Sequence, residues 1–303
     1  MVRDAEEKTR LAVTGEDRKL FLARTRRNQA VSIPYDSLTD RYVLAERSLS
    51  SGKLLILSSM KKPSGGAVLY LYGSLFLDPP KKEDFRLAGK LVDKTGCDVC
   101  FLLMPLFPDH SLREMVASVE EALFYLTTHY ARERTAVLAF STSCLLCLDA
   151  LGWHREQGSI PMPGRLILNS PILRIPASEA LLKQMKVLDR YDVRLPIEFF
   201  AKDGICGSVV EAEETENQYL RDPLFGSLYG LPATDVYYGT NENAYVYLPE
   251  LTEAYRRADI PLTVHKGELL MHCWSLYDNC EEAKHTIQEY IEIIRGLGGS
   301  PIQ

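Results

Sequence analysis

Short apolar runs alternate with amphipathic stretches of helical length over residues 43 to 264 of the chain. Runs of strand length occupy residues 99–104 and 135–140, and apolar residues recur at helical spacing in residues 112–130. Strands that alternate with helices in this way form mostly parallel sheets covered on both faces. The sequence therefore predicts an α/β protein, a three-layer sandwich with about eight mostly parallel strands.

Turn signals and cap signals set the expected boundaries of these elements. Residues 54–57 and 67–72 are predicted to be adjacent strands, because the stretch at 61–66 (KKPSGG) has the composition of a turn. Ser111 is a plausible N-cap of the helix at 112–130, with Glu114 as its capping-box partner. Further strands are expected at 165–169, 235–238 and 261–264, and further helices at 83–94, 144–157, 249–257 and 280–294.

Two charged segments stand outside the alternation. Residues 4–27 have the pattern of a helix, and residues 177–221 form a long, charged, helical insertion between two strands. Open α/β sheets bind ligands at the carboxyl ends of their strands, where such segments can form a lid. We therefore expect a helical cap from residues 1–39 and 177–221, over a core from residues 40–176 and 222–303.

Composition restricts the classes of partner. The chain has 303 residues, which suits one large domain, and its formal net charge of -6 with scattered basic residues gives no footprint for nucleic acid. The sequence has neither an apolar run of roughly 20 residues for a membrane span nor the apolar centre of a secretory signal. Seven cysteines, several within apolar runs, indicate reduced thiols, and a cytoplasmic protein is expected.

Several short motifs follow one another along the chain. They are VLYLYGSLF at 68–76, TGCD at 95–98, MPLFPDH at 104–110, VLAFSTSC at 137–144, LILNSP at 166–171, YGTNE at 238–242 and MHCW at 271–274. In order and approximate spacing they resemble the conserved segments of the hormone-sensitive-lipase-like esterases, over roughly residues 40 to 295. The resemblance implies an α/β-hydrolase fold, hydrolysis of a small apolar acyl ester, and no metal or organic cofactor.

The resemblance also assigns catalytic roles, which such hydrolysis divides among a nucleophile, a general base and an orienting acid. Counting back from Ser170 without a gap places Thr142 at the nucleophile, and the matching loops place His272 as base and Glu242 as acid. A shift of one residue would offer Ser141 or Ser143 instead. That shift rotates the following helix by about 100° and moves its leucines off their face.

The loop at residues 72–75 departs from the family pattern. Tyr72 replaces a histidine, and Ser74 and Leu75 replace glycines that hold φ values that leucine adopts poorly. By resemblance, the backbone N–H groups of Gly73, Ser74 and Ser143 are expected to form the oxyanion hole. Tyr72 is expected to line the pocket, and Trp274 either to line it or to pack against the last helix.

Two other classes of function stay open at this point. Replacements at Tyr72, Leu75, Phe140 and Cys144 favour a non-catalytic protein that binds a small apolar ligand. Retention of His272 and Glu242 also suits acid–base chemistry without a covalent step. The CxxC pairs Cys97/Cys100 and Cys144/Cys147 are interpreted as buried packing rather than zinc ligands, and pairing of two copies through an edge strand is a further expectation.

Overall fold

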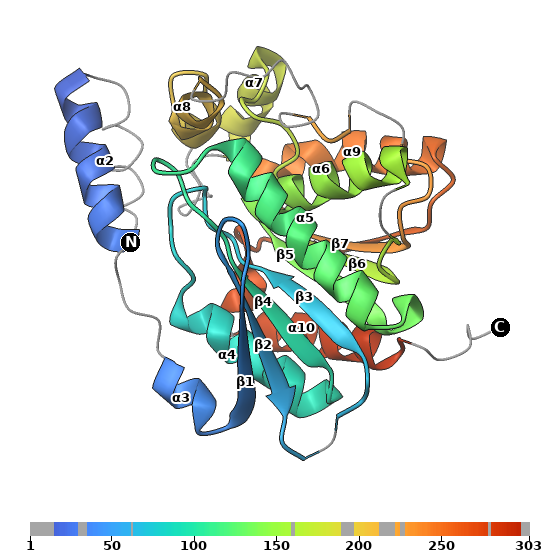
Figure 1. Ribbon diagram of the computed structural model, residues 1–303. Helices are drawn as coiled ribbons and strands as arrows, with labels where there is room; N and C mark the ends of the chain where they lie inside the picture. Colours follow the sequence, from blue (N-terminus) through green and yellow to red (C-terminus); the bar gives the residue numbers. More distant parts are fainter. Residues whose placement is uncertain are drawn as a thin grey trace.

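The computed structural model forms one sheet between two layers of helices (Figure 1). Its eight strands run in the order β1-β2-β4-β3-β5-β6-β7-β8. Pairs from β4 to β8 are parallel, and β1–β2 and β2–β4 are antiparallel. The strands are β1 (Tyr42–Ser48), β2 (Lys53–Ser59), β3 (Ala67–Leu71), β4 (Asp98–Leu103), β5 (Thr135–Phe140), β6 (Arg165–Asn169), β7 (Thr234–Gly239) and β8 (Leu262–Gly267). The predicted three-layer α/β sandwich is confirmed.

The structure describes residues 15–29, 35–61, 63–158, 161–188, 197–211, 222–224, 228–277 and 280–297. The predictions for residues 4–14 and for the remaining parts of 177–221 lie outside these ranges.

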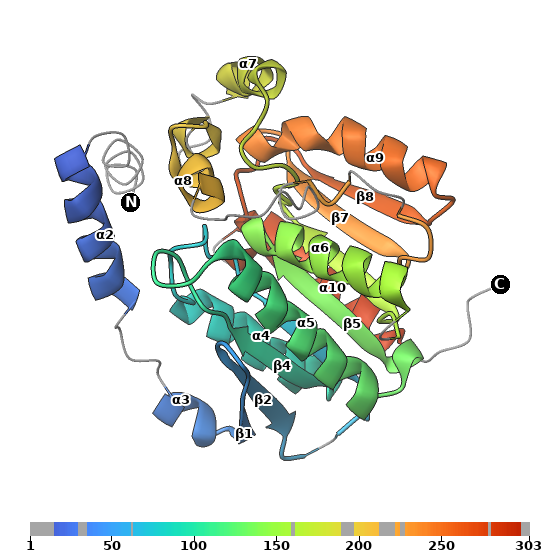
Figure 2. The same cartoon turned by 45° about the horizontal axis from the view of Figure 1, so that its top comes forward.

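Helices cover both faces of the sheet. α5 (Leu112–His129), α6 (Thr142–Gln157) and α9 (Leu248–Arg257) lie on one face, and α4 (Lys82–Thr95) and α10 (Glu281–Arg295) on the other (Figures 1 and 2). Ser111 caps α5 as expected, since its Oγ accepts the Glu114 N–H and the Glu114 carboxylate accepts the Ser111 N–H. Gly158 follows α6 with φ 59°, the left-handed conformation in which glycine commonly ends a helix.

The predicted pairing of β2 with β3 is wrong. β4 lies between them, antiparallel to β2 and parallel to β3. The Gly-rich turn does reverse the chain, but it leaves room for one strand between β2 and β3. The chain returns through α4 and places β4 in that gap. A short turn therefore fixed the relative direction of the two strands without making them neighbours.

α6 is buried along its whole first half. Every residue from 141 to 152 is buried, including the polar Ser141, Thr142 and Ser143. A helix that is apolar on all sides has no exposed face to preserve. A one-residue shift would therefore move no leucine from a buried to an exposed face. The leucine positions thus give no argument against Ser141 or Ser143 as the nucleophile.

Strand register brings the functional loops to one edge. Phe140 at the end of β5 pairs with Asn169 at the end of β6, and Asn169 pairs with Tyr237 in β7. Gly239 and Gly267 end β7 and β8 side by side. The segments that follow β3, β5, β7 and β8 therefore meet at the carboxyl edge of the sheet.

Parts of the predicted cap lie at this edge. α7 (Glu179–Leu188) and α8 (Ile205–Glu211) stand above the carboxyl ends of the strands in both views (Figures 1 and 2). η2 (Ile197–Phe200) connects them to the core, because Phe199 stacks on Phe76 with ring centroids 6.5 Å apart. Among the described helices, none has the length and apolarity needed to cross a membrane.

The N-terminal helix α2 (Gly15–Gln29) confirms the helical prediction for the described part of that segment, but it stands apart from the sheet (Figure 2). Its Leu22 packs against the edge of the hydrophobic core, and polar side chains make its other contacts. The Gln29 side-chain amide donates to the carbonyls of Leu77 and Phe107 at 2.8 and 2.7 Å. Arg26 pairs with Asp109 at 2.6 Å.

Asp149 is a buried carboxyl in α6, and it makes stability depend on pH. Asp149 is 3% exposed, and within the described chain its Oδ1 has no hydrogen-bond partner. Burial, with a smaller effect of the Glu120 carboxylate, raises the pKa of Asp149 to about 7. The folded chain keeps a proton that the unfolded chain releases above about pH 4, so the free energy of unfolding falls between about pH 4 and 7.

We expect Asp149→Asn to raise the free energy of unfolding by about 2–3 kcal/mol at pH 8 and to change it little at pH 4.5. Urea denaturation at the two pH values measures this, with Asp36→Asn, an exposed aspartate in α3 (Tyr35–Thr39), as control. An equal gain at both pH values would show that ionisation of Asp149 is not the cause.

Candidate active site

Ser141 occupies the sharp turn between β5 and α6. Its φ is +56°, and its backbone is held by a bond from its N–H to the Asn169 carbonyl at 2.9 Å. Its own carbonyl accepts the Cys144 N–H at 3.1 Å and the Ile172 N–H at 3.3 Å. A non-glycine residue in this region costs about 1–2 kcal/mol, so three bonds keep a strained residue in place.

Ser141, His272 and Glu242 form a hydrogen-bonded chain. Ser141 Oγ lies 2.8 Å from His272 Nε2, and His272 Nδ1 lies 2.6 Å from Glu242 Oε2. The other carboxylate oxygen of Glu242 accepts the Gly239 N–H at 2.8 Å. All three side chains are buried, since Ser141 is 2%, His272 6% and Glu242 0% exposed. Nδ1–H donates to the carboxylate, which leaves Nε2 free to accept the serine proton.

The structure brings Ser141, and not the predicted Thr142, to His272. Thr142 is the first residue of α6, and among the described residues its buried Oγ1 has no hydrogen-bond partner. Placing Ser141 at the turn moves the motif register one residue earlier. In it, Ala139 and Ser143 are the small residues two positions from the turn, and Phe140 and Cys144 no longer replace glycines.

Gly73 and Ser74 lie beside the turn, as expected. A Cβ added to Gly73 would stand 3.1 Å from Ser141 Cβ, so the close approach of the two backbones needs glycine. The Ser143 hydroxyl donates to the Tyr72 carbonyl and ties the two loops together. Among the described residues, the backbone hydrogen bonds formed outside helices and strands include none donated by the N–H groups of Gly73, Ser74 and Thr142. Thr142 therefore takes the place predicted for the Ser143 N–H, because the residue after the nucleophile supplies that donor.

The strain expected at Leu75 is present. Leu75 and Phe76 have φ values of +52° and +64°, and the Phe76 N–H donates to Ser74 Oγ at 3.0 Å. Ser74 also accepts the Leu77 and Asp78 N–H groups at 2.9 and 2.6 Å through its carbonyl. Side-chain and backbone bonds of Ser74 thus hold a loop shape that glycine would adopt without cost.

Tyr72 and Trp274 do not join the other predicted residues. The buried ring of Tyr72 stacks on Phe101 at 5.9 Å between centroids, so this side chain packs in the core. Trp274 is buried against α10, where its indole N–H donates to Thr286 Oγ1 at 3.3 Å. It lines a cavity on that face of the sheet, away from Ser141.

Ser170 holds the histidine loop, a function that the sequence did not indicate. Its Oγ accepts the Cys273 N–H at 2.9 Å, and its own N–H donates to the Tyr237 carbonyl at 2.7 Å. Both Ser170 and Cys273 have positive φ, at 50° and 53°. The sequence feature that could have indicated this role is the NSP motif at the end of β6, since the side chain of a serine in such a turn often forms hydrogen bonds with nearby backbone groups.

Local contacts also set the charge of His272. Burial alone lowers the pKa of His272, but the adjacent Cys273 side chain and the Glu242 carboxylate outweigh it, so the pKa lies above its ordinary value. Among the described residues no group of three His, Cys, Asp or Glu side chains is arranged to hold a metal ion.

Comparison with solved structures identifies the architecture. A protein from Staphylococcus aureus, provisionally described as an esterase, superposes with a TM-score of 0.79 at 17% identity over 92% of each chain. An esterase of the bacterial hormone-sensitive lipase family superposes with a TM-score of 0.72 at 19% identity, over 91% of this chain and 96% of the other. The fold is an α/β-hydrolase fold.

A Pyrobaculum calidifontis esterase superposes with a TM-score of 0.73 at 13% identity, over 93% of this chain and 94% of the other. No protein-family model and no curated protein matches the sequence. In α/β-hydrolases the nucleophile stands on the strand-to-helix turn, and the acid and histidine follow in that order along the chain. Ser141, Glu242 and His272 follow this order.

The strain at Ser141 leads to a stability prediction. Ser141→Gly and Ser141→Ala both remove the bond to His272, but only glycine relieves the positive φ. We expect the glycine variant to have the higher free energy of unfolding, by about 0.5–1 kcal/mol. Urea denaturation of the two variants measures the difference, and a more stable alanine variant would contradict strain at this turn.

Proposed function

We propose that the protein is a carboxylic-ester hydrolase for small, apolar acyl esters, with Ser141 as nucleophile, His272 as general base and Glu242 as orienting acid. The observation that carries the proposal is the 2.8 Å contact between Ser141 Oγ and His272 Nε2, with Glu242 on the opposite ring nitrogen. This arrangement satisfies the geometric requirement for an activated hydroxyl.

In the proposed reaction Ser141 Oγ attacks the ester carbonyl carbon while His272 Nε2 takes the serine proton. The tetrahedral intermediate collapses, the C–O bond to the alcohol breaks, and His272 returns the proton to the leaving alkoxide. A water then attacks the acyl-enzyme with His272 again as base, and the acid leaves as Ser141 regains its proton. Glu242 stabilises the imidazolium that forms in each half of the reaction.

The unpartnered N–H groups of Gly73, Ser74 and Thr142 support an oxyanion hole beside Ser141. Such donors are worth about 10²–10³ in kcat each when they face the developing charge. They are backbone groups, so the loss of the family glycines at Ser74 and Leu75 does not remove them.

Aromatic contacts above the site support an apolar substrate. Phe199 stacks on Phe76, next to the Gly73–Ser74 side, and Phe200 lies 6.4 Å from Tyr247, next to the Glu242 side. The cap segments thus contact both sides of the site through phenylalanine.

Hydrolysis of p-nitrophenyl butyrate by the purified protein tests the proposal. We expect turnover that His272→Ala lowers at least about 10³-fold, because the serine then lacks its base. His285→Ala, at an exposed histidine of α10, is the matched control and should keep full activity. No turnover above the His272→Ala variant on acetyl, butyryl and hexanoyl esters would refute the hydrolase assignment.

A further inference from the structure

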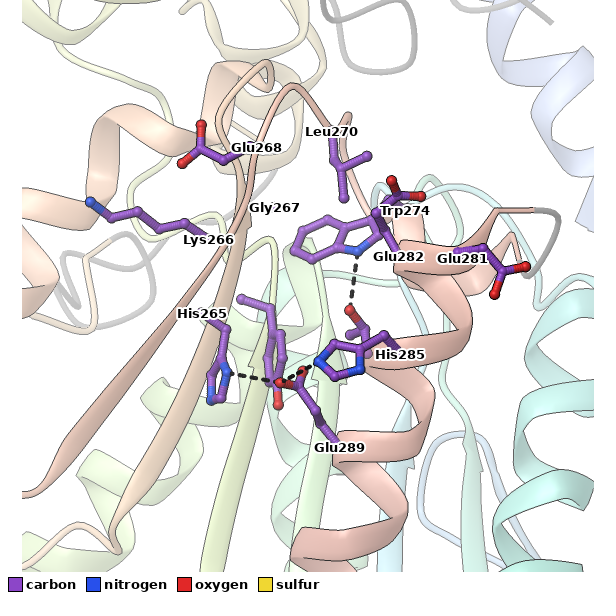
Figure 3. A pocket seen from close by; sticks show the side chains of 12 residues that line it. His265, Lys266, Gly267, Glu268, Leu270, Trp274, Glu281, Glu282, His285 and Glu289 are labelled. Atoms are coloured by element: carbon purple, nitrogen blue, oxygen red, sulfur yellow. Dashed lines mark hydrogen bonds and ion pairs between the residues drawn. The ribbon is translucent and has the colours of Figure 1, made fainter.

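A second cavity of about 610 Å³ lies between β8 and α10 (Figure 3). One wall is the loop that carries His272, through Leu270 and Trp274, but none of Ser141, Glu242 and His272 lines it. A Cβ on Gly267 would stand 2.7 Å from Leu270 Cδ1 and 3.1 Å from the Trp274 ring. Glycine at the end of β8 therefore lets the apolar wall pack onto the strand.

A carboxylate stands in this cavity beside two imidazole rings. Glu289 Oε1 lies 3.5 Å from His285 Nε2 and 3.6 Å from His265 Nδ1, distances too long for strong hydrogen bonds. The other ring nitrogen of His265, Nε2, lies 3.1 Å from Asp235 Oδ1. Figure 3 shows the Lys266 side chain on the far side of β8, pointing away from Glu289.

The Tyr237 hydroxyl is the polar group of this cavity that lacks a hydrogen-bond partner among the described residues. Tyr237 lines the cavity with a side chain that is 0% exposed, and within the described part of the chain its hydroxyl forms no hydrogen bond. Its ring is stacked on His265 at 4.1 Å between centroids and contacts Trp274 at 6.5 Å. Packing therefore fixes the hydroxyl in place, and leaving it unpaired costs about 1–3 kcal/mol.

We propose that this cavity binds a small organic ammonium ion. An ammonium group carries N–H donors for the Tyr237 oxygen and a positive charge for the Glu289 carboxylate, whose histidine neighbours stand 3.5 and 3.6 Å away. The apolar part of the ligand would lie against Leu270 and the Trp274 ring, which also attracts cations. Glu282, on the first turn of α10 at the cavity wall, adds negative charge that raises the local concentration of cations, whereas its neighbour Glu281 pairs with Lys284 at 2.6 Å.

A bare metal ion is a weaker match for the same charge, because no three described ligands are already placed for coordination. The proposal does not depend on ester hydrolysis, since the cavity contains no group of the Ser141 site.

Calorimetric titration at pH 8 with benzylammonium, and with benzyl alcohol as its neutral isostere, tests the site. We expect saturable benzylammonium binding with a dissociation constant of about 1 mM and no binding of the alcohol. Glu289→Gln should weaken binding at least about 10-fold, and Tyr237→Phe about 3- to 10-fold. Glu292→Gln, an exposed residue one turn along α10, is the matched control and should leave binding unchanged.

Three results would overturn the proposal: no saturable binding at 50 mM benzylammonium, equal binding of benzyl alcohol, or unchanged affinity in Glu289→Gln. A fourth result would assign the cavity to a metal instead: the wild type binds Zn²⁺ tightly and does not bind benzylammonium, and Glu289→Gln abolishes the Zn²⁺ binding. Tyr237→Phe removes only one unpartnered oxygen, so its thermal unfolding should occur at or above the wild-type temperature, which separates lost binding from lost folding.

Discussion

Ser141→Ala is expected to lower kcat for p-nitrophenyl butyrate by at least about 10³-fold, while Thr142→Ala stays within about 10-fold of the wild type. The two hydroxyls are adjacent in sequence, but only Ser141 Oγ contacts His272, and Thr142 Oγ1 is buried away from any described partner. Alanine at 142 keeps the backbone N–H that the oxyanion requires, so the second change removes no catalytic group.

This pair of variants separates the two registers of the turn. Both substitutions are small and buried, and circular dichroism with thermal unfolding shows whether each variant folds. If Thr142→Ala lost as much activity as Ser141→Ala while remaining folded, the serine-based mechanism would be wrong. Equal, wild-type activity in both would place the nucleophile outside this turn.

Glu242→Gln is expected to lower kcat by about 10²–10⁴-fold and to move the acid limb of the pH profile to lower pH. Burial alone lowers the pKa of His272, but Cys273 and the Glu242 carboxylate raise it above its ordinary value near 6.5. The base acts only when neutral, so wild-type activity rises with pH through that raised pKa. An amide at residue 242 removes the charge that favours the imidazolium. The pKa of His272 then falls, and the acid limb of the profile moves to lower pH.

The measurement is kcat/KM for p-nitrophenyl butyrate between pH 5 and 9, which reports the free enzyme. Glu253→Gln, an exposed residue of α9 paired with Arg256, should leave both the rate and the limb unchanged. A Glu242→Gln profile that keeps the wild-type acid limb would show that Glu242 does not set the charge of His272.

The order of helices and strands could be predicted from the sequence, because the spacing of apolar residues and the capping residues indicate the same element boundaries in most of the chain. Strands β5 and β6 have the predicted bounds, and Ser111 caps α5. The pairing of β2 with β3 was not readable, because turn composition records a chain reversal and not which strand is later inserted. Non-local pairing of this kind depends on the whole sheet.

The site was predictable to within one residue. His272 and Glu242 meet as expected, whereas the nucleophile position depends on a backbone φ that neither composition nor spacing reveals. The spacing of the leucines in α6 could not reveal the one-residue error, because a helix that is buried on all sides has no exposed face to fix its rotation. The cavity at Glu289 was missed for another reason: its residues come from β7, β8 and α10 and meet only in the folded chain.

Covalent labelling with p-nitrophenyl diethyl phosphate tests the central claim most directly, because the reagent phosphorylates an activated serine and stops there. We expect one diethylphosphoryl group per chain, located on Ser141 by peptide mass spectrometry, with label absent from Ser141→Ala and strongly reduced in His272→Ala. Label on Thr142, or equal labelling of the wild type and His272→Ala, would contradict a nucleophilic Ser141 activated by His272.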